Sequence, residues 1–456
     1  MDWKKECVLV VGAGISGNAA AKMVKGFGAE VTLSDSKKRE DISFDLSELE
    51  NIGVKLVFGP QTEALLDGVT RVIVSPAVPV RIPLIQAAYK RGIRVESEIE
   101  FSYELAKAPI YAVTGTNGKT TTTTLLGLLM ETVYPVVGVG GNIGVPLCEE
   151  VMRAGSEGCT VAEISSYQLE GTEHFLPKAA AILNVTPDHV VRHGSLDVYQ
   201  QMKEKIFSQQ SKDDYVVLNY DNAPTRSMAN RAPSTVCFFS RLEKLEQGAF
   251  VENDNLVMRW NGVTHTILPV KELKIKGSHN VENALAACAV AFLAGAEPAK
   301  MAEVLRTFPG VEHRIEPVTE VDGVMYYNDS KATNTDSSIK ALESFPGERV
   351  ILVAGGDDKM TDLTEFMQLV KKNCDAMILV GDAAARFKEN ALKNGITEEQ
   401  IYEAGYSMEK AVEIAHEIAH APQIVLLSPA CASFDMFTGF EERGRVFKDL
   451  VKKLKK

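Results

Sequence analysis

The strongest chemical signal in this 456-residue sequence is a glycine-rich segment, residues 113–120, which reads Val-Thr-Gly-Thr-Asn-Gly-Lys-Thr. Glycines at a strand-to-helix turn let backbone N–H groups converge on a phosphate. Lys119 would balance the charge of the β- and γ-phosphates of ATP, and the Thr120 hydroxyl would bind magnesium. Val113 stands where the full P-loop pattern has its first glycine, so a polar turn without a ligand is the alternative interpretation. The pattern favours ATP binding.

A second glycine-rich turn, residues 12–17, follows a predicted strand and reads Gly-Ala-Gly-Ile-Ser-Gly. Asp35 lies eighteen residues after Gly17, where an acidic residue of a dinucleotide fold receives a ribose hydroxyl. NAD, another nucleotide diphosphate such as a UDP-sugar and a structural turn are all compatible with this fingerprint alone, because any diphosphate can dock at the start of a helix. The sequence favours a nucleotide diphosphate other than NAD.

Polar residues at two later strand ends could complete a site for phosphate transfer. Glu163 ends an apolar strand, and His189 follows another, in the segment Asn184-Val-Thr-Pro-Asp-His. Ligands of open α/β sheets bind beyond the carboxyl ends of the strands, so both side chains could face a nucleotide at Lys119 and share a magnesium ion. Each residue alone is typical of a protein surface. Their combination with a phosphate loop favours a metal site.

Two polar turns near the end of the chain could bind an acceptor substrate with charged groups. Residues 329–334 read Asp-Ser-Lys-Ala-Thr-Asn, and residues 429–435 read Pro-Ala-Cys-Ala-Ser-Phe-Asp. Each follows a predicted strand, at the edge of the sheet where ligands bind. Both local sequences are unspecific and also fit ordinary loops.

The elements that would position these residues alternate between short apolar runs and helical patterns, which predicts parallel sheets covered by helices. The pattern restarts near residue 108 and again near 311, and a chain of this length exceeds what one hydrophobic core usually organises. We therefore predict three α/β domains, at 1–108, 109–311 and 312–456. The predicted strands are 7–11, 30–33, 54–58 and 71–74, then 110–113, 160–163, 179–184 and 215–218 with a strand-rich stretch near 235–270, then 324–327, 349–353, 376–380 and 423–427.

Composition narrows the class of protein. A formal charge of -12 argues against non-specific binding to nucleic acid or to an anionic membrane. The seven cysteines are scattered without a CxxC pair, which is typical of reduced thiols rather than of a disulfide frame or a zinc site. The N-terminus is too acidic for a signal peptide, and no apolar run is long enough to span a bilayer. We expect a soluble, cytoplasmic protein that is a monomer.

A set of motifs then appears in order along the chain. They are Gly-Thr-Asn-Gly-Lys-Thr, Gly141-Asn142-Ile-Gly, Glu163-Ile-Ser-Ser-Tyr-Gln-Leu, Pro187-Asp-His189, Ser278-His-Asn280-Val-Glu-Asn283-Ala, His313-Arg314 and Asp329-Ser-Lys-Ala-Thr-Asn. The ordered set resembles the Mur ligase family from end to end, and most closely the branch that adds D-glutamate. The resemblance implies an N-terminal Rossmann-like domain that binds UDP, a central P-loop-type domain that binds ATP and a C-terminal Rossmann-like domain that binds the amino acid.

The resemblance also implies roles for individual residues. The catalytic residues would be Lys119, His189 and Lys203. The ATP site would contain Gly115, Thr116, Asn117, Gly118, Lys119, Thr120, Thr121, Asn280, Asn283, Arg314 and Asp329. The UDP substrate would contact Ile15, Ser16, Asp35, Ser36 and Asn142, and D-glutamate would contact Lys331, Thr333, Lys359, Ser433, Phe434 and Phe440. Magnesium, at two sites, would be bound by Thr120, Glu163, His189 and Lys203.

Lys203 matches a lysine that the family carries as a carbamate. An ammonium cannot bind magnesium, but carbamylation converts this cation into an oxygen anion that can. The neighbouring Lys205 is the rival position, and a solvated helix face is the alternative interpretation of both lysines.

The reaction that the resemblance implies joins the carboxylate of UDP-N-acetylmuramoyl-L-alanine to the amine of D-glutamate. ATP would convert the carboxylate into an acyl phosphate, and the amine would attack it through a tetrahedral intermediate. The alternatives are another Mur-type ligase or a folylpolyglutamate ligase with a different acceptor. A dinucleotide-dependent oxidoreductase would leave the loop at Lys119 unexplained, and a nucleotide switch without chemistry would leave the acceptor residues unused.

Overall fold

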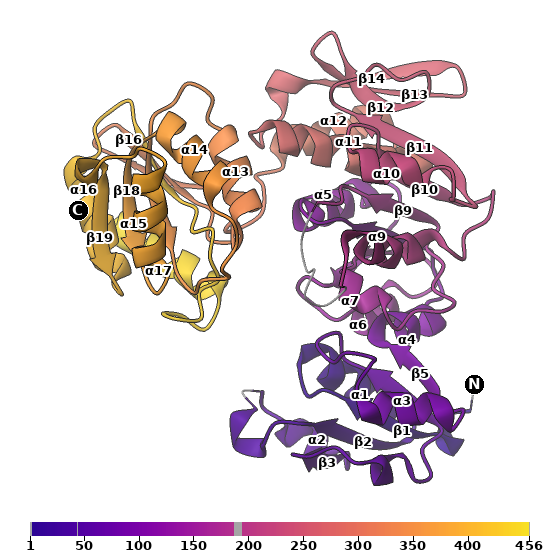
Figure 1. Ribbon diagram of the computed structural model, residues 1–456. Coiled ribbons are helices and arrows are strands. Elements are labelled where there is room, and N and C mark those ends of the chain that lie inside the picture. The colour runs from indigo at the N-terminus through magenta and orange to yellow at the C-terminus, as the bar shows by residue number, and fades with distance from the viewer. Residues whose placement is uncertain (1, 43, 187–193, 456) are drawn as a thin grey trace. The chain divides into compact units, whose positions relative to one another are not determined.

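The structure is a computed structural model that describes residues 2–42, 44–186 and 194–455. Its described strands form three sheets (Figure 1). The chain divides into two compact units. The first unit comprises residues 1–273 and 282–307 and carries the first two sheets, and the second unit comprises residues 274–281 and 308–456 and carries the third.

The first sheet has five parallel strands in the order β3-β2-β1-β4-β5. Its elements are β1 (Cys7–Val11), α1 (Ile15–Gly26), β2 (Glu30–Asp35), α2 (Ser47–Asn51), β3 (Lys55–Phe58), β4 (Arg71–Val74), α3 (Pro83–Lys90) and β5 (Arg94–Ser97). Successive side chains of a strand point to opposite faces. Val8 and Val10 of β1 therefore join one hydrophobic core, with residues of α1, while Leu9 and Val11 join another, with residues of α3. A strand covered on both faces reads as a continuous apolar run, which is why the sequence revealed β1.

The second sheet has nine strands in the order β14-β13-β12-β11-β10-β9-β6-β8-β7. They are β6 (Ile110–Thr114), β7 (Val137–Gly141), β8 (Cys159–Glu163), β9 (Ala179–Ile182), β10 (Tyr215–Asn219), β11 (Thr235–Ser240), β12 (Gly248–Glu252), β13 (Asn255–Trp260) and β14 (Val263–Pro269). The pairing is parallel except at β12–β13 and β13–β14. The helices of this part are α5 (Lys119–Met130), α6 (Leu147–Ala154), α7 (Ser166–Leu169), α9 (Leu196–Glu204), α10 (Ala223–Met228), α11 (Ser278–Leu293) and α12 (Pro298–Thr307).

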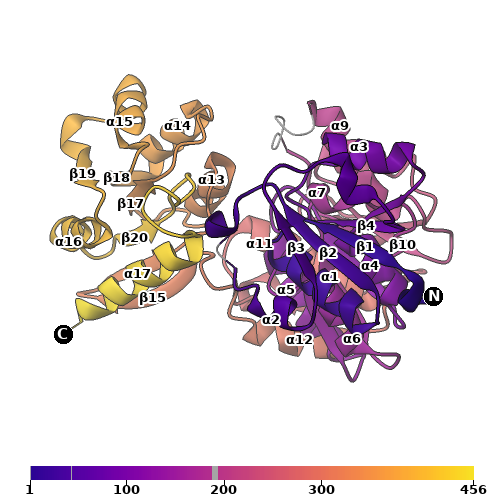
Figure 2. The ribbon, with the colours of Figure 1, turned by 90° about the horizontal axis from the view of Figure 1, so that it is seen from below.

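The third sheet has six strands in the order β15-β16-β20-β17-β18-β19, of which only the β15–β16 pair is antiparallel. The strands are β15 (Glu316–Val321), β16 (Val324–Asn328), β17 (Val350–Gly355), β18 (Cys374–Val380), β19 (Ile401–Gly405) and β20 (Ile424–Leu427). Helices α13 (Thr335–Glu343), α14 (Thr364–Asn373), α15 (Ala384–Lys393), α16 (Met408–Ile418) and α17 (Phe440–Lys453) cover them. Helix α17 lies along β15 (Figure 2).

The predicted fold class, an α/β protein with three sheet-containing parts, is confirmed, whereas the boundaries at 108 and 311 stay predictions. Sequence patterns did not reveal β5, β7, β15 or β19. Strand β5 reads Arg-Val-Glu-Ser and β7 reads Val-Gly-Val-Gly-Gly, so neither has an uninterrupted apolar run. In the part of the chain that the structure describes, no helix combines the length and apolarity needed to cross a membrane.

Helix α4 (Glu98–Leu105) joins the first two sheets through two buried carboxylates. Ser97 donates its backbone N–H to Gly171 O at 2.9 Å, and the next residue, Glu98, accepts a bond from Cys148 N at 2.8 Å. Glu100 accepts backbone N–H bonds from three consecutive residues, Glu173, His174 and Phe175. Burial raises the pKa of Glu98. Removing either carboxylate would leave buried N–H donors unpaired, so α4 fixes the two sheets to each other.

A buried ion-pair network holds the base of the first sheet. Arg71 of β4 has a side chain only 4% exposed and lies 2.7 Å from oxygens of both Glu96 and Glu104. Arg94 pairs with the same two carboxylates, and the Arg71 guanidinium also stacks 4.8 Å from the Trp3 ring centroid. Burial raises the pKa of Glu96 to about 7, against the lowering effect of the two arginines. The network ties β4, β5 and α4 together.

We expect Arg71→Met to destabilise the first unit by about 3–5 kcal/mol, because Met keeps the packing volume but leaves two carboxylates short of a cation. The change is measured by urea unfolding followed by the fluorescence of Trp3 in a Trp260→Phe background. Arg91→Met is the matched control, since Arg91 pairs with Glu63 and Asp67 at the surface and should cost less than about 1 kcal/mol. Equal losses in the two variants would show that burial of the Arg71 network adds no stability.

Candidate active site

The phosphate loop connects β6, an interior strand of the second sheet between β9 and β8, to α5. Gly118, immediately before α5, has a φ of 84°, a conformation that glycine adopts without strain. A Cβ at this position would lie 2.3 Å from Oδ1 of Asn283 in α11. The glycine therefore lets the loop approach the asparagine that the sequence assigned to the ATP site. Lys119 and Thr120 open the first turn of α5, where backbone N–H groups favour an anion.

Two lysines converge on one carbonyl oxygen of this loop. Lys119 Nζ lies 3.0 Å from Gly115 O and 2.9 Å from Thr116 O. Lys203 Nζ, from α9, lies 2.9 Å from the same Gly115 O and 4.4 Å from the centroid of the Tyr199 ring. The side chain of Lys203 is buried although it is a lysine. Positive charge is thus concentrated where the phosphates of a nucleotide would lie.

The structure distinguishes the two candidate carbamate lysines. Lys205 does not reach the phosphate loop and instead donates to Glu170 O at 3.0 Å. Burial lowers the pKa of Lys205. Two residues of helix turn the chain by about 200°. Lys203 is therefore the one of the pair that lies at the phosphate loop.

Asn184, which sequence reasoning did not assign to the site, fixes the first half of the phosphate loop. Its Oδ1 accepts the backbone N–H bonds of Thr116, at 3.1 Å, and of Asn117, at 2.8 Å, while its Nδ2 donates to Asn117 O at 3.2 Å. The hydroxyl of Thr116 lies 3.3 Å from both Thr186 O and the Tyr199 hydroxyl. The sequence offered one sign of this role: Asn184 comes two residues after the buried strand β9, and the phosphate loop follows the neighbouring strand β6.

Glu163, at the end of β8, is the strongest candidate magnesium ligand among the described residues. Its side chain is 1% exposed, and Oε1 accepts a bond from Asn142 Nδ2 at 2.7 Å. Oε2 is buried without a hydrogen-bond partner among the described residues. A buried carboxylate oxygen without a hydrogen-bond partner among the described residues fits a hard cation, because magnesium prefers oxygen ligands. His189, another of the predicted magnesium ligands, lies outside the described residues.

A second group of acidic side chains does not suit a metal ion, because a lysine already pairs with it. Glu312, His313 and Glu316 in the second unit have ligand atoms within 4.8 Å of one another. Lys448 already bonds both carboxylates, at 2.6 and 2.9 Å. Asn328 Nδ2 donates to His313 Nδ1 at 2.9 Å, and its Oδ1 accepts from Ser330 N, which places the histidine proton on Nε2. The ammonium group of Lys448 serves as the cation of this cluster.

A pocket of about 350 Å³ lies at the carboxyl edge of the first sheet, within the first unit. It is lined by Gly12, Asp35, Ser36, Gln61, Ala77, Val78, Pro79, Ile82, Pro83 and Leu84. Two of the predicted UDP-binding residues, Asp35 and Ser36, are among these, whereas Ile15 and Ser16 lie in the first turn of α1. Asp35 accepts bonds from Ala13 N and Lys37 N, both at 2.9 Å, and so braces the glycine-rich turn. Gln61, which donates to Ser34 Oγ at 3.0 Å, was not predicted.

The predicted acceptor residues of the second unit lie on loops after β16, β17 and β20 and at the start of α17. Lys331 Nζ lies 5.4 Å from the centroid of the Phe440 ring. Ser433 is buried, whereas the ring of Phe434 is 71% exposed, and Thr333 N donates to Lys331 O. Lys359, after β17, is exposed. The adjacent Asp358 is fixed by two bonds from Arg386, at 2.6 and 2.7 Å.

Arg443, a residue that the sequence did not single out, holds two of these loops together. Its Nε donates to Ser330 Oγ at 2.9 Å, and Nη2 donates to Ser330 O at 2.8 Å. The other loop accepts through Cys431 O and Ala432 O, at 3.1 and 2.9 Å. Burial lowers the pKa of this guanidinium to about 10, so it remains charged at neutral pH. The rigid, planar fork of arginine suits such a set of acceptors.

Asp329 and Arg314, predicted for ATP, approach each other in the second unit. Asp329 Oδ1 accepts from Ile315 N at 3.2 Å and lies 3.8 Å from Arg314 Nη1, and Oδ2 accepts from Ser428 Oγ at 2.8 Å. Complete burial raises the pKa of Asp329 to about 6, although Arg314 favours the charged form. Arg314 lies close enough to Asp329 to favour its ionised state.

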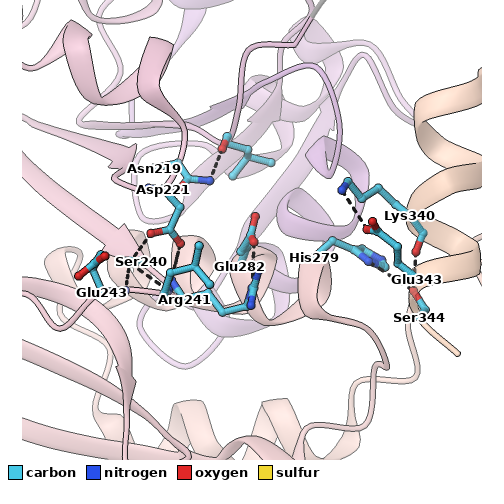
Figure 3. Close-up of polar contacts among 12 residues, drawn as sticks. Asn219, Asp221, Ser240, Arg241, Glu243, His279, Glu282, Lys340, Glu343 and Ser344 are labelled. Atoms are coloured by element: carbon cyan, nitrogen blue, oxygen red, sulfur yellow. Dashed lines mark hydrogen bonds and ion pairs between the residues drawn. The ribbon is translucent and has the colours of Figure 1, made fainter. Parts of the chain in front are cut away.

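The first turn of α11 carries a neutral histidine, His279 (Figure 3). His279 Nδ1 lies 3.5 Å from Ser344 Oγ in the second unit, and burial together with Arg314 and Lys340 lowers its pKa to about 3. Asn280 donates to Lys276 O at 2.6 Å, which shapes the turn before the helix. In the first unit, Arg241 binds Glu282 of α11 at 3.0 Å, next to the hydrogen bonds that Asp221 accepts from Ser240 and Arg241 (Figure 3).

The fold and the phosphate loop together define a class of nucleotide-dependent enzymes, and comparison with known proteins identifies the family. Family models match residues 6–97 (Mur ligase MurD-like, N-terminal domain), 113–291 (Mur ligase middle domain) and 313–431 (Mur ligase, glutamate ligase domain). These matches cover most of the sequence. The chain therefore belongs to the Mur ligase family, whose members are ATP-dependent ligases that form amide bonds.

Relatives of known name match over the whole chain. The UDP-N-acetylmuramoylalanine--D-glutamate ligase of Thermoanaerobacter sp. (strain X514) is 43% identical over 456 residues, covering 100% of both chains. The protein of the same name from Pelotomaculum thermopropionicum is 44% identical over 455 residues, covering 100% of this chain and 99% of its own.

Solved structures share the fold at lower identity. The UDP-N-acetylmuramate-alanine ligase MurC of Thermotoga maritima has a TM-score of 0.60 at 20% identity and covers 98% of this chain and 99% of its own. A MurF structure from Acinetobacter baumannii has a TM-score of 0.62 at 17% identity, with coverage of 97% and 93%. These likenesses bear on the fold alone. Family membership excludes the oxidoreductase interpretation of the turn at residues 12–17.

We expect Asn184→Ala to raise the KM for ATP about tenfold, because about 1.4 kcal/mol is a typical cost of removing the acceptor of a loop N–H group. The bond lost is that of Asn117 N, whereas Thr116 N also donates to the backbone O of Asn184 at 2.9 Å, which alanine keeps. The KM for the amino acid should change little, since the side chain of Asn184 bonds residues of the phosphate loop. Steady-state phosphate release with ATP varied measures the effect.

Asn222→Ala is the matched control for this prediction. Asn222 binds Val185 N and caps α10, so it supports the same segment without contacting the phosphate loop. If both variants raised the KM for ATP equally, Asn184 would be acting through the general stability of the segment.

Proposed function

We propose that this chain adds D-glutamate to UDP-N-acetylmuramoyl-L-alanine, with ATP converted to ADP and phosphate, in the synthesis of peptidoglycan precursors. The observation that carries the proposal is the 43% identity, over the full length of both chains, to a ligase of that name. The presence in one unit of a phosphate loop with two converging lysines and of a buried, partly unsatisfied carboxylate supports it.

The chemical problem in this reaction is the carboxylate, which is a poor electrophile because its leaving group would be oxide. Transfer of the γ-phosphoryl group of ATP turns one carboxylate oxygen into part of an acyl phosphate, from which phosphate leaves readily. The neutral amine of D-glutamate then attacks the carbonyl carbon and forms a tetrahedral intermediate. Collapse of the intermediate expels phosphate and leaves the amide.

The residues of the phosphate loop would hold ATP for this transfer. Lys119 and the N–H groups at the start of α5 would offset the charge of the phosphates, and each such contact is worth a few kcal/mol at most, about 3 kcal/mol for one lost donor in a comparable site. Thr120, Glu163 and His189 would bind magnesium, which when present shields the phosphate oxygens from the incoming carboxylate. Asn280, Asn283, Arg314 and Asp329 would bind the rest of the nucleotide.

We also infer that Lys203 is carbamylated and is a ligand of a second magnesium ion. Two ammonium groups within 3.0 Å of one carbonyl oxygen repel each other, and carbamylation of the buried one removes a positive charge. The resulting carbamate would supply the oxygen ligands that magnesium prefers.

The remaining assignments of the proposal follow the domain order of the family. Residues 1–108 would bind the uridine diphosphate through Ile15, Ser16, Asp35 and Ser36, with Asn142 of the central domain, 109–311, near the sugar. Residues 312–456 would bind D-glutamate through Lys331, Thr333, Lys359, Ser433, Phe434 and Phe440. We propose that the enzyme works in the cytoplasm as a monomer.

Phosphate release should require UDP-N-acetylmuramoyl-L-alanine, D-glutamate and ATP together. The measurement is a coupled phosphate assay with a panel of amino acids and of UDP-muramyl precursors. L-glutamate, L-alanine and meso-diaminopimelate should give less than about 1% of the D-glutamate rate, because the site has to pair both carboxylates of one enantiomer. Full activity with another acceptor would assign the chain to a sister activity.

The carbamate at Lys203 should give a carbon-13 carbonyl resonance when the enzyme is equilibrated with labelled bicarbonate. Lys203→Arg should abolish both the resonance and the activity, since arginine keeps the charge but cannot form the carbamate. Lys205→Arg is the matched control and should keep both. An active wild-type enzyme without this resonance would refute the inference.

A further inference from the structure

The turn after β7 is attached to the candidate magnesium ligand by three separate contacts. Gly141 pairs with Glu163 in the sheet. The next residue, Asn142, donates its backbone N–H to Glu163 O at 2.8 Å and its side-chain Nδ2 to Glu163 Oε1 at 2.7 Å. Backbone and side chain of one residue thus bind backbone and side chain of the other.

Gly141 makes this approach sterically possible. Its φ is 103°, and a Cβ at this position would lie 2.4 Å from Glu163 O. Any larger residue would push the turn away from β8 and break both bonds of Asn142. The position of Asn142 over Glu163 is therefore set by backbone packing and does not depend on a flexible loop.

The two oxygens of the Glu163 carboxylate have different environments as a result. Oε1 is occupied by the amide of Asn142, and Oε2 is buried without a partner among the described residues. A carboxylate can bind a cation through either oxygen or both. Magnesium requires close to ideal octahedral geometry, so the orientation of each ligand matters. Hydrogen bonds to a metal ligand commonly change metal affinity 10–100-fold.

We propose that Asn142 is a positioning residue for the divalent cation: its amide fixes the Glu163 carboxylate so that Oε2 is presented to the metal. This inference rests on the proposed function, which makes Glu163 a magnesium ligand. Asn142 is itself exposed, so its Oδ1 stays available to the UDP substrate that the same proposal assigns to it. One carboxamide then contacts both the substrate and the ligand of the metal.

Because Asn142 would contact both the UDP substrate and Glu163, it would couple the binding of the substrate to the binding of the metal. Substrate bound to Oδ1 would hold the carboxamide in the orientation that donates to Glu163, which favours the metal. By thermodynamic reciprocity, the metal would favour substrate binding by the same factor. Removal of the Asn142 carboxamide should abolish this coupling and should also weaken the binding of the metal.

The test measures Mn²⁺ binding directly, by electron paramagnetic resonance of free Mn²⁺, on the full-length enzyme saturated with ADP. We expect Asn142→Ala to weaken Mn²⁺ binding about 10–100-fold. The UDP substrate should tighten Mn²⁺ binding in the wild type and leave it unchanged in the variant. Asn142→Ser, whose hydroxyl is too short to reach Glu163, provides a second variant should alanine disturb the turn.

A double-mutant cycle with Glu163→Gln shows whether Asn142 affects Mn²⁺ binding through Glu163 or independently of it. If Asn142 acts through Glu163, Asn142→Ala should have little further effect on Mn²⁺ affinity in the Glu163→Gln background. Gln61→Ala is the control for a pure substrate effect, because Gln61 lines the pocket of the first sheet and should leave Mn²⁺ affinity in ADP unchanged.

Each failure has a distinct meaning. Unchanged Mn²⁺ affinity in Glu163→Gln would overturn the metal assignment within the proposed function. A large loss in Glu163→Gln with none in Asn142→Ala or Asn142→Ser would overturn only the positioning role of Asn142. An equal loss from Asn142→Ala in both backgrounds would also overturn it, since the effect would not pass through Glu163.

Discussion

The candidate site of the first unit depends on the register of three adjacent parallel strands, β9, β6 and β8. Thr114 of β6 is aligned with Ile182 of β9, and Val113 is aligned with Glu163 of β8. Parallel strands end at the same edge of a sheet, so the phosphate loop, Asn184 and the Glu163 carboxylate emerge side by side. The loop would lose its hydrogen bonds to Asn184, and Glu163 would face the wrong side, if either neighbour slipped by one residue.

The sequence was enough to predict the phosphate loop at this edge, because the residues of the loop are consecutive. The strand into the phosphate loop is apolar, and Gly118-Lys119-Thr120 has few other uses at a strand-to-helix turn. The alternation of apolar runs and helices was likewise enough to predict three α/β parts. The three-domain fold class followed from local pattern, since strands buried on both faces are apolar throughout.

What the sequence could not predict depends on distant contacts. Lys203 and Lys205 differ only in helix face, and which face meets the loop depends on packing. Asn184 and Arg443 resemble ordinary loop and surface-helix residues until the backbone groups that they bind are known. Strand β5 carries Arg94 and Glu96, which look solvent-exposed in sequence but are satisfied by Arg71 and Glu104.

Several charged side chains of the described residues are buried where they fix backbone. Arg443 spans the loops after β16 and β20 through Ser330 O and Cys431 O, and Glu100 binds three consecutive N–H groups. Replacing such a charged group with an apolar one would leave buried backbone groups without hydrogen-bond partners. The loss of those partners would destabilise the fold. Loops held in this way can present reactive side chains with little conformational freedom.

The two buried carboxylates of α4 fix the spacing between the two sheets of the first unit. They fix the sheet that carries the pocket lined by Asp35 and Ser36 to the sheet that carries the phosphate loop, through Cys148 on one side and residues 173–175 on the other. A substrate that places its diphosphate in the pocket and its carboxylate at the loop must then match a length built into the protein skeleton. Selection against shorter or longer precursors would need no contact with the part of the molecule that differs.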